Sequence, residues 1–267
     1  MANLGVQRRR QNRTVLFPRN KLKEYSVTLV DQPLQHKHRV VLTHARDFWL
    51  ARGAVVAVVA LQLLLVNDFS IGARWVAPSI ELLLLIPLSV ATAWVHKEVR
   101  RATVEEHFHF AGSLRRNIRR AALALTALIT VMNFVALFFL VRALLGGHAG
   151  NARSLLIDAV NIWLTNVIAF ALWYWGTDRG GPAGRGLGVH TKADFLFPNM
   201  TLPEGSGGAW TPGFVDYLFL SFTNATAFSP TDTLPLSGRA KLLMMAEAGI
   251  SLLTLALVAA RAVNILS

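Results

Sequence analysis

The stretch that decides the fold runs from Phe214 to Ser237 and reads FVDYLFLSFTNATAFSPTDTLPLS. It is apolar enough to enter a bilayer, yet it contains Asp216, Asn224 and Asp232, and two prolines interrupt its second half. A long apolar segment follows it. Backbone without helical hydrogen bonds occurs at membrane depth only where it is buried in protein or lines a water-filled cavity. We therefore predict a re-entrant loop, which enters the membrane and returns to the same side before a final span.

The rest of the chain is also strongly apolar, with 53% hydrophobic residues among its 267 residues. A helix rises about 1.5 Å per residue, so about 20 residues cross the roughly 30 Å of hydrocarbon in a bilayer. Several blocks of this length predict an all-α, polytopic transmembrane helix bundle with about five spans plus the re-entrant loop. The predicted spans are residues 48–66, 75–95, 121–145, 155–175 and 241–266.

The net charge of +12 is concentrated in two segments. Residues 1–53 contain 11 lysines and arginines against 3 acids, and residues 97–120 contain 7 against 3. Positive flanks of membrane spans lie on the cytoplasmic side. The protein is thus predicted to be a multi-pass protein of the plasma (inner) membrane with a cytoplasmic N-terminus. The basic segments favour anionic lipid headgroups as partners, and no nucleic acid, because a membrane protein already requires this charge for its topology.

These features divide the chain into three parts. Residues 1–46 form a basic cytoplasmic N-terminal arm. Residues 47–145 form a three-span bundle that contains the basic cytoplasmic loop 97–120. Residues 155–267 resemble a pore domain, with one helix, the re-entrant loop (214–237) and the last helix.

Several classes of function are disfavoured by what the sequence lacks. There is no cysteine, which excludes disulfides, thiolate metal sites and cysteine nucleophiles. The motifs of hydrolases and metalloproteases are missing, so we predict no enzyme, no catalytic residue and no cofactor. The acids and histidines from Glu105 to His109 lack the spacing of a helical zinc site, and no metal is predicted. The glycine-rich runs Gly180–Gly188 and Gly205–Gly208 predict flexible linkers, because no phosphate-binding lysine follows them.

The last predicted span carries a polar stripe on an otherwise apolar helix. Glu247, Ser251 and Thr254 fall on one face of this helix. An acid near the middle of a membrane is a candidate functional residue. The alternative is a structural pair between helices, in which Glu247 accepts a hydrogen bond from Arg142 or Asn133.

The earlier spans contain further intramembrane polar residues. Asp158, Asn161 and Thr165 lie on one face of the fourth span, Glu81 lies in the second and Asn133 lies at the centre of the third. Because polar groups are costly in hydrocarbon, the polar face of the fourth span is predicted to point into the protein.

Residues 221–237, SFTNATAFSPTDTLPLS, resemble the pore loop of two-helix potassium channels, whose pattern runs Ser-Phe, Thr-Thr-Val-Gly-Tyr-Gly-Asp, Pro and Ser. The two patterns coincide without a gap at Ser221, Phe222, Thr226, Asp232, Pro235 and Ser237. The resemblance implies a pore helix over residues 214–225, with the fourth span as the outer helix and the last span as the inner helix. The end of the chain also resembles a family of uncharacterised bacterial integral membrane proteins.

The sequence departs from the channel pattern at the filter. Ser229, Pro230 and Thr231 replace the Gly-Tyr-Gly of the family. The potassium filter turns backbone carbonyls toward the ion, and that backbone requires the positive φ that glycine adopts, whereas Pro230 fixes φ near −65°. A standard potassium-selective filter is therefore not expected. The predicted topology also places the entrance of the loop on the cytoplasmic side, opposite to potassium channels.

Three functions remain open at this point. The first is channel-like permeation of monovalent cations through a homo-oligomer. Its candidate path residues are Thr226, Ser229, Thr231, Asp232, Glu247, Ser251 and Thr254. The second is a secondary transporter with a broken helix at residues 229–235. The third is a membrane protein with a structural or partner-binding role, in which Asp232 caps backbone amides of a turn.

Overall fold

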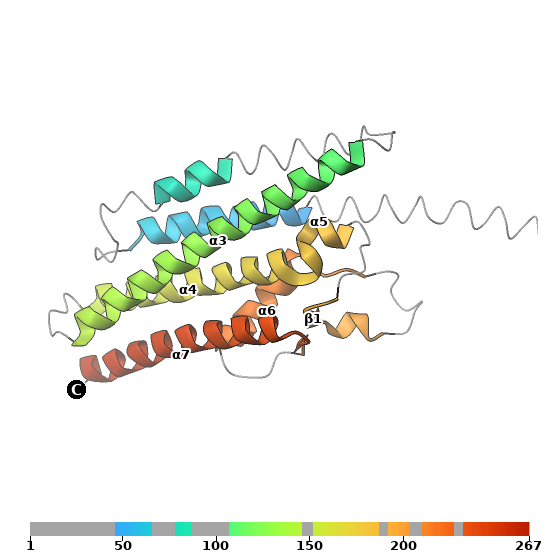
Figure 1. The fold of residues 1–267 in the computed structure, drawn as a ribbon. Helices are drawn as coiled ribbons and strands as arrows, with labels where there is room; N and C mark the ends of the chain where they lie inside the picture. The colour runs from blue at the N-terminus through green and yellow to red at the C-terminus, as the bar shows by residue number, and fades with distance from the viewer. Residues whose placement is uncertain are drawn as a thin grey trace, which may run out of the picture. The chain divides into compact units, whose positions relative to one another are not determined.

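The computed structural model describes residues 46–65, 78–86, 107–145, 152–186, 192–202, 210–226 and 232–266. The chain divides into a unit of Met1–Leu42, which lies outside these residues, and a unit of Thr43–Ser267. The described part of the second unit is mostly helical (Figure 1), as predicted. The predicted arm 1–46 falls almost wholly outside the described residues, and so do residues 97–106 of the predicted basic loop.

Three helices are long and apolar enough to cross a membrane: α3 (His107–Leu145), α4 (Ala152–Thr177) and α7 (Gly238–Leu266). They contain the third, fourth and last predicted spans, as expected of a membrane protein. Within the described residues these are three candidate spans, fewer than the five that the sequence predicts.

The first two predicted spans are represented by shorter helices. Residues 46–63 form a helix that covers most of the first span, but Arg46, Asp47 and Arg52 place three charges in its first turns. Residues 78–86 are the described helical part of the second span. By length and composition, neither of these described helices qualifies as a candidate span.

The basic segment before the third span is helical rather than a loop over its second half. α3 begins at His107 and has 39 residues, which correspond to about 58 Å at about 1.5 Å per residue. This length is nearly twice the hydrocarbon thickness of about 30 Å. The helical part of the segment, residues 107–120, contains four arginines, and arginine is a strong helix former. The helix of the third span therefore continues through the arginines that precede the span.

α6 (Phe214–Thr226) corresponds to the predicted pore helix over residues 214–225, and it packs against α4 and α7 (Figure 1). At its start, the ring of Phe214 lies 5.9 Å from that of Trp175. Near its end, the ring of Phe222 lies 5.8 Å from that of Trp163. From residue 163 to residue 175 α4 rises by about 18 Å at about 1.5 Å per residue. α6 therefore extends along about half of α4, starting from the C-terminal end of α4.

After α6, the chain returns to the C-terminal end of α4. β2 (Leu234–Pro235) pairs antiparallel with β1 (Phe195–Leu196), which belongs to the connection that leaves α4. α7 then begins at Gly238, and Arg239 donates to the carbonyl oxygen of Thr177 at 3.3 Å. The segments before and after α6 thus lie at the same end of α4.

Residues 180–186 of the glycine-rich run after α4 form helical turns, where a flexible linker was predicted. The chain forms a short 3-10 turn, Asp178–Gly180, and then α5 (Gly181–Gly186), and a second short turn follows at Pro198–Met200. Gly181 has a φ of 80°, and a Cβ atom there would lie 2.8 Å from the carbonyl oxygen of Gly176. Only glycine fits this turn. The other run, Gly205–Gly208, lies outside the described residues.

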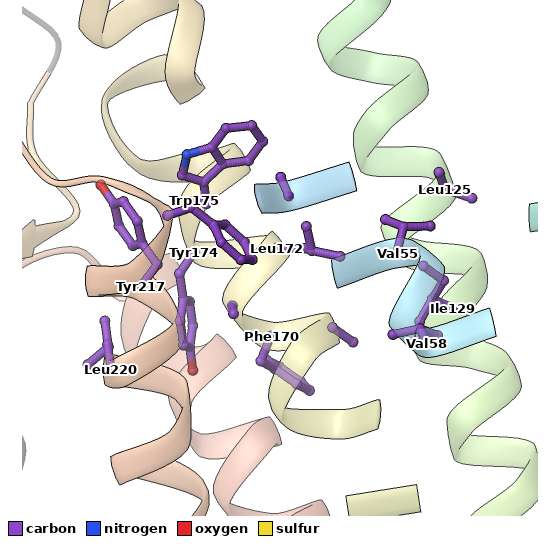
Figure 2. Packing of buried hydrophobic residues seen from close by; sticks show 14 of the residues in the cluster. Val55, Val58, Leu125, Ile129, Phe170, Leu172, Tyr174, Trp175, Tyr217 and Leu220 are labelled. Carbon is purple, nitrogen blue, oxygen red and sulfur yellow. The ribbon is translucent and has the colours of Figure 1, made fainter. Parts of the chain in front are cut away.

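The larger apolar core joins the helix of residues 46–63 to α3, α4, α6 and β1. Figure 2 shows Val55 and Val58 facing Leu125 and Ile129 of α3, with the large side chains of α4 beside them. A second cluster joins the C-terminal half of α3 to the start of α4. Between these apolar contacts, α4, α6 and α7 enclose polar side chains.

Candidate functional site

Glu247 lies at the centre of a buried polar cluster between α4, α6 and α7. Its side chain is fully buried. Tyr174 of α4 donates to its Oε2 at 2.5 Å, and Asn224 of α6 donates to the same oxygen at 2.7 Å. The Ser221 hydroxyl of α6 is hydrogen-bonded to Oε1. We call these four residues and their neighbours Asn166 and Ser251 the Glu247 cluster.

The predicted polar stripe of α7 belongs to this cluster or continues it. Asn166 of α4 donates to the Ser251 hydroxyl at 2.8 Å and to the Glu247 carbonyl at 3.3 Å. Thr254 donates to Ile250 of its own helix at 2.8 Å. Glu247, Ser251 and Thr254 are all fully buried. Glu247 takes its hydrogen bonds from α4 and α6 rather than from Arg142 or Asn133, the partners that the structural alternative proposed.

α6 presents a polar face to this cluster and an apolar face to its surroundings. Tyr217, Ser221 and Asn224 stand at i, i+4 and i+7, which is one side of a helix. The residues Val215 and Phe219 of the other side are exposed. This spacing in the sequence indicates the buried face of α6. None of Tyr217, Ser221 and Asn224 is among the predicted site residues.

A second polar cluster lies at the C-terminal end of α4 and surrounds Asp178, which is fully buried. Tyr217 donates to its Oδ2 at 2.5 Å, and the backbone nitrogen of Asp194 donates to its Oδ1 at 2.7 Å. The Asp194 carboxylate in turn pairs with Arg239. We call Asp178, Arg185, Asp194, Tyr217 and Arg239 the Asp178 cluster.

Three arginines satisfy the last carbonyl oxygens of α4, which have no partner within the helix. Arg185 donates to Trp175 and also to Asp178, at 2.9 Å each. Arg119 donates to the carbonyl oxygen of Gly176 at 3.2 Å, and Arg239 donates to that of Thr177 at 3.3 Å. Positive charge also complements the partial negative charge of a helix C-terminus.

Arg185 is the most enclosed of these arginines. Its guanidinium lies 5.0 Å from the centre of the Tyr217 ring, close enough for a cation–π interaction. Burial lowers the pKa of the Arg185 guanidinium, and the nearby Tyr217 and Asp178 act in the opposite direction. Asp178 and Asp194 thus place negative charge where the fold buries an arginine.

Phe195 stands between the two clusters. Its ring centroid lies 5.1 Å from that of Tyr174 and 6.4 Å from that of Tyr217. Figure 2 shows the hydroxyl groups of the two tyrosines pointing in opposite directions. The Tyr174 hydroxyl donates to Glu247, and the Tyr217 hydroxyl donates to Asp178. The aromatic rings of Tyr174, Phe195 and Tyr217 therefore lie between the two polar clusters.

The loop residues predicted from the channel resemblance take no part in the Glu247 cluster where the structure describes them. Thr226 is half-buried and donates to Thr223 of its own helix at 2.9 Å. Asp232 is exposed. Ser229 and Thr231 lie outside the described residues.

The remaining intramembrane polar residues are buried in separate places. Glu81 accepts a hydrogen bond from Gln62 at 2.9 Å. Asn133, Asp158 and Asn161 are buried on α3 and α4, so the polar face of α4 points into the protein. The side chains from Glu105 to His109 lie outside the described ones. Among the residues that the structure describes, no group of three or more histidines and acids is placed to hold a metal ion.

Sequence reasoning missed most partners of both clusters. Tyr174, Asp178, Arg185 and Asp194 are not among the predicted site residues, and Arg185 falls in the glycine-rich run predicted to be a linker. The one available signal was the density of charged residues in an otherwise glycine-rich connection. Comparison with known proteins adds no partner or activity, since the chain matches no family model, no curated protein and no solved structure.

Proposed function

We propose that this protein is a multi-pass membrane protein in which residues 214–237 form a re-entrant helix and loop, and that several copies form a channel-like path for monovalent cations. The placement of α6 carries this proposal. α6 reaches Trp163, about half of the way along α4, and yet Arg239 contacts Thr177 at the end where α6 began. A segment with this course enters a bilayer without crossing it.

The distribution of charge supports a cytoplasmic entrance for the loop. The end of the bundle where α6 begins carries Arg116, Arg119, Arg120, Arg179, Arg239 and Lys241. The opposite end, where α3 finishes and α4 begins, carries Arg142 and Arg153. An excess of lysine and arginine marks the cytoplasmic side of a membrane protein. We therefore place this end in the cytoplasm and the protein in the inner membrane.

The polar groups inside the protomer narrow the choice of path residues. Glu247, Ser251 and Thr254 are fully buried and face α4 or α6 within one chain. We therefore assign Glu247 to holding α6 in place and assign the path to the loop from Thr226 to Asp232. An exposed carboxylate at position 232, repeated in each copy, forms a ring of negative charge that attracts cations.

The path requires neighbouring copies, and the surface of the protomer supports their presence. α7 is the least covered of the three long helices. Leu242 and Met245 of α7, and Val215 and Phe219 of α6, are exposed within one protomer. These apolar surfaces suit lipid or a second copy of the chain, and a shared axis beside α6 would bring the loops together.

Reconstitution in liposomes tests this function. We expect purified protein to pass potassium or sodium ions, and Asp232→Asn to lower the flux several-fold because it removes the ring of charge. The matched control is Lys241→Gln, which removes an exposed charge at the same end but outside the loop. Flux equal to that of empty liposomes, or flux unchanged by Asp232→Asn, would refute the cation path.

A structural or partner-binding role is the second candidate, and one observation favours it. Tyr217, Ser221 and Asn224, the polar face of α6, all make hydrogen bonds within the same chain. A loop fastened in this way stabilises a surface for a partner without conducting ions. In this case the liposomes show no flux in any variant, whereas changes in the two clusters still destabilise the protein.

A further inference from the structure

The hydrogen bonds of Ser221 determine the protonation of Glu247. The Ser221 hydroxyl lies 2.6 Å from the carbonyl oxygen of Val167 and also contacts Oε1 of Glu247. A hydroxyl has one hydrogen, and a carbonyl oxygen can only accept. If the hydrogen of Ser221 points to Val167, the contact with Oε1 requires a hydrogen from the carboxyl group.

The other oxygen of Glu247 is already supplied with donors. Asn224 Nδ2 lies 3.0 Å from the carbonyl oxygen of Met244 and 2.7 Å from Oε2 of Glu247. Because Met244 offers an acceptor, the nitrogen of the amide must face it, and the same nitrogen donates to Oε2. Tyr174 also donates to Oε2. A proton on Glu247 would therefore lie on Oε1.

Among the residues that the structure describes, the side chains that contact Glu247 are not cations. Within the described part of the chain Glu247 forms no ion pair. Tyr174 is the titratable side chain that contacts it, and Ser221 and Asn224 of α6 are neutral. The other described charged side chains of the packed helices are Arg116, Arg119, Arg120 and Arg142 of α3, Arg153 and Asp158 of α4, Asp216 of α6, and Arg239 and Lys241 of α7. A buried carboxylate without a cation is costly, whereas a neutral carboxyl group is not.

We propose that Glu247 is protonated at Oε1 and that its carboxyl group donates a hydrogen bond to Ser221. This neutral form of Glu247 holds α6 against α4 and α7. The neutral carboxyl group connects Ser221 and Asn224 of α6 to Tyr174 of α4. When the proton leaves, the single hydrogen of Ser221 can serve Oε1 or the carbonyl oxygen of Val167 but not both, so one of the two contacts that hold α6 at Ser221 is lost. The site is a proton-controlled latch on α6, and it is independent of whether cations permeate.

Infrared spectroscopy tests the proton directly. At neutral pH we expect the carbonyl stretch of a protonated carboxylic acid, and we expect it to disappear in Glu247→Gln. Asp232→Asn, at an exposed acid, is the control and should leave this band in place. Loss of an ionised carboxylate band in Glu247→Gln, in place of the protonated band, would overturn the proposal.

A second measurement keeps the test decisive if Glu247→Gln does not fold. On raising the pH, the protonated band of the wild-type protein should decline together with the protection of α6 amides from hydrogen exchange. The melting temperature should fall as the pH rises above the ordinary pKa of glutamate, where the folded state holds a proton that the unfolded chain releases, and it should level off once the band has disappeared. Where Glu247→Gln folds, its melting temperature should not show this fall. Unchanged protection of α6 after the band has disappeared would refute the latch.

Discussion

The Glu247 cluster and the Asp178 cluster each bury an acid inside the protein, but they surround that acid with different partners. Each contains a fully buried acid that accepts a tyrosine hydroxyl at 2.5 Å, from Tyr174 in one and from Tyr217 in the other. Asp178 has Arg179 at 3.9 Å, and Arg185 lies over the ring of Tyr217. In the described part of the chain, Glu247 has only neutral donors.

The difference follows from position along α4. The Asp178 cluster lies at the arginine-rich end of the helices, where long basic side chains reach water or headgroups. The Glu247 cluster lies two to three turns further along, among apolar side chains, where a cation would itself need a partner. The acid near the end therefore lies beside arginines, and the acid in the interior is surrounded by neutral donors.

The largest expected effect on stability comes from neutralising Asp178, the acid near the C-terminal end of α4. Asp178→Asn removes the ion-pair partner of Arg179 and the negative charge that offsets the burial of Arg185, and loss of one partner of a buried ion pair costs up to about 3–5 kcal/mol. We expect a fall of this size in the free energy of unfolding, measured by denaturation in mixed micelles. A loss below about 1 kcal/mol would show that Asp178 does not compensate buried positive charge.

The corresponding change at the other cluster should be mild. Glu247→Gln keeps a donor toward Ser221 and an acceptor for Tyr174 and Asn224, so we expect a loss of at most about 1 kcal/mol. Glu247→Ala leaves Tyr174 without its acceptor and removes one hydrogen bond each from Ser221 and Asn224, so at about 1–3 kcal/mol for a buried unsatisfied group it should cost about 2–4 kcal/mol. If the two variants are equally unstable, the contrast between a neutral and a charged acid fails.

The two tyrosines sharpen the comparison on a smaller scale. Hydrogen bonds to charged groups contribute about 1.5–3 kcal/mol, and those between neutral groups about 0.5–1.5 kcal/mol. Tyr217→Phe should therefore destabilise the protein more than Tyr174→Phe, in parallel denaturation experiments. The reverse order would place the ionised acid in the interior and the neutral one at the end.

The smallest effect on stability is expected at Asp232, which is exposed and belongs to neither cluster. Asp232→Asn should change the free energy of unfolding by no more than about 0.5 kcal/mol, as is usual for surface positions. A flux change in this variant would then report on permeation rather than on folding. A large loss of stability would instead identify Asp232 as a structural cap.

The positions of α4, α6 and α7 were predictable because residues close to each helix determine where it begins and ends. Apolar blocks of membrane length placed α4 and α7, and the polar residues and prolines after Thr226 placed the end of α6. The partners of Glu247 were not predictable, since Tyr174, Ser221 and Asn224 come from two other helices whose rotation is set by packing. The Asp178 cluster escaped prediction because it depends on the turn at Gly181, which folds a glycine-rich segment back onto α4.

The first two spans show a different limit. Arg46 and Asp47 directly precede the first apolar block and Arg52 lies within it, and a count of apolar residues alone does not register these charges. Pro87 lies within the second predicted span and just beyond the described helix of residues 78–86. Composition therefore identified membrane character correctly, but it did not determine how many helices qualify as spans.

The re-entrant course of residues 214–237 is the central claim, and single-cysteine labelling tests it most directly. The chain has no cysteine, so each introduced thiol reports on one position. Thr201→Cys precedes α6, Leu236→Cys follows it, and Leu145→Cys marks the opposite end; all three positions are exposed. An impermeant maleimide should label Thr201→Cys and Leu236→Cys from the cytoplasmic side and Leu145→Cys from the other side. Labelling of Thr201→Cys and Leu236→Cys from opposite sides would show that the segment crosses the membrane and would contradict the account.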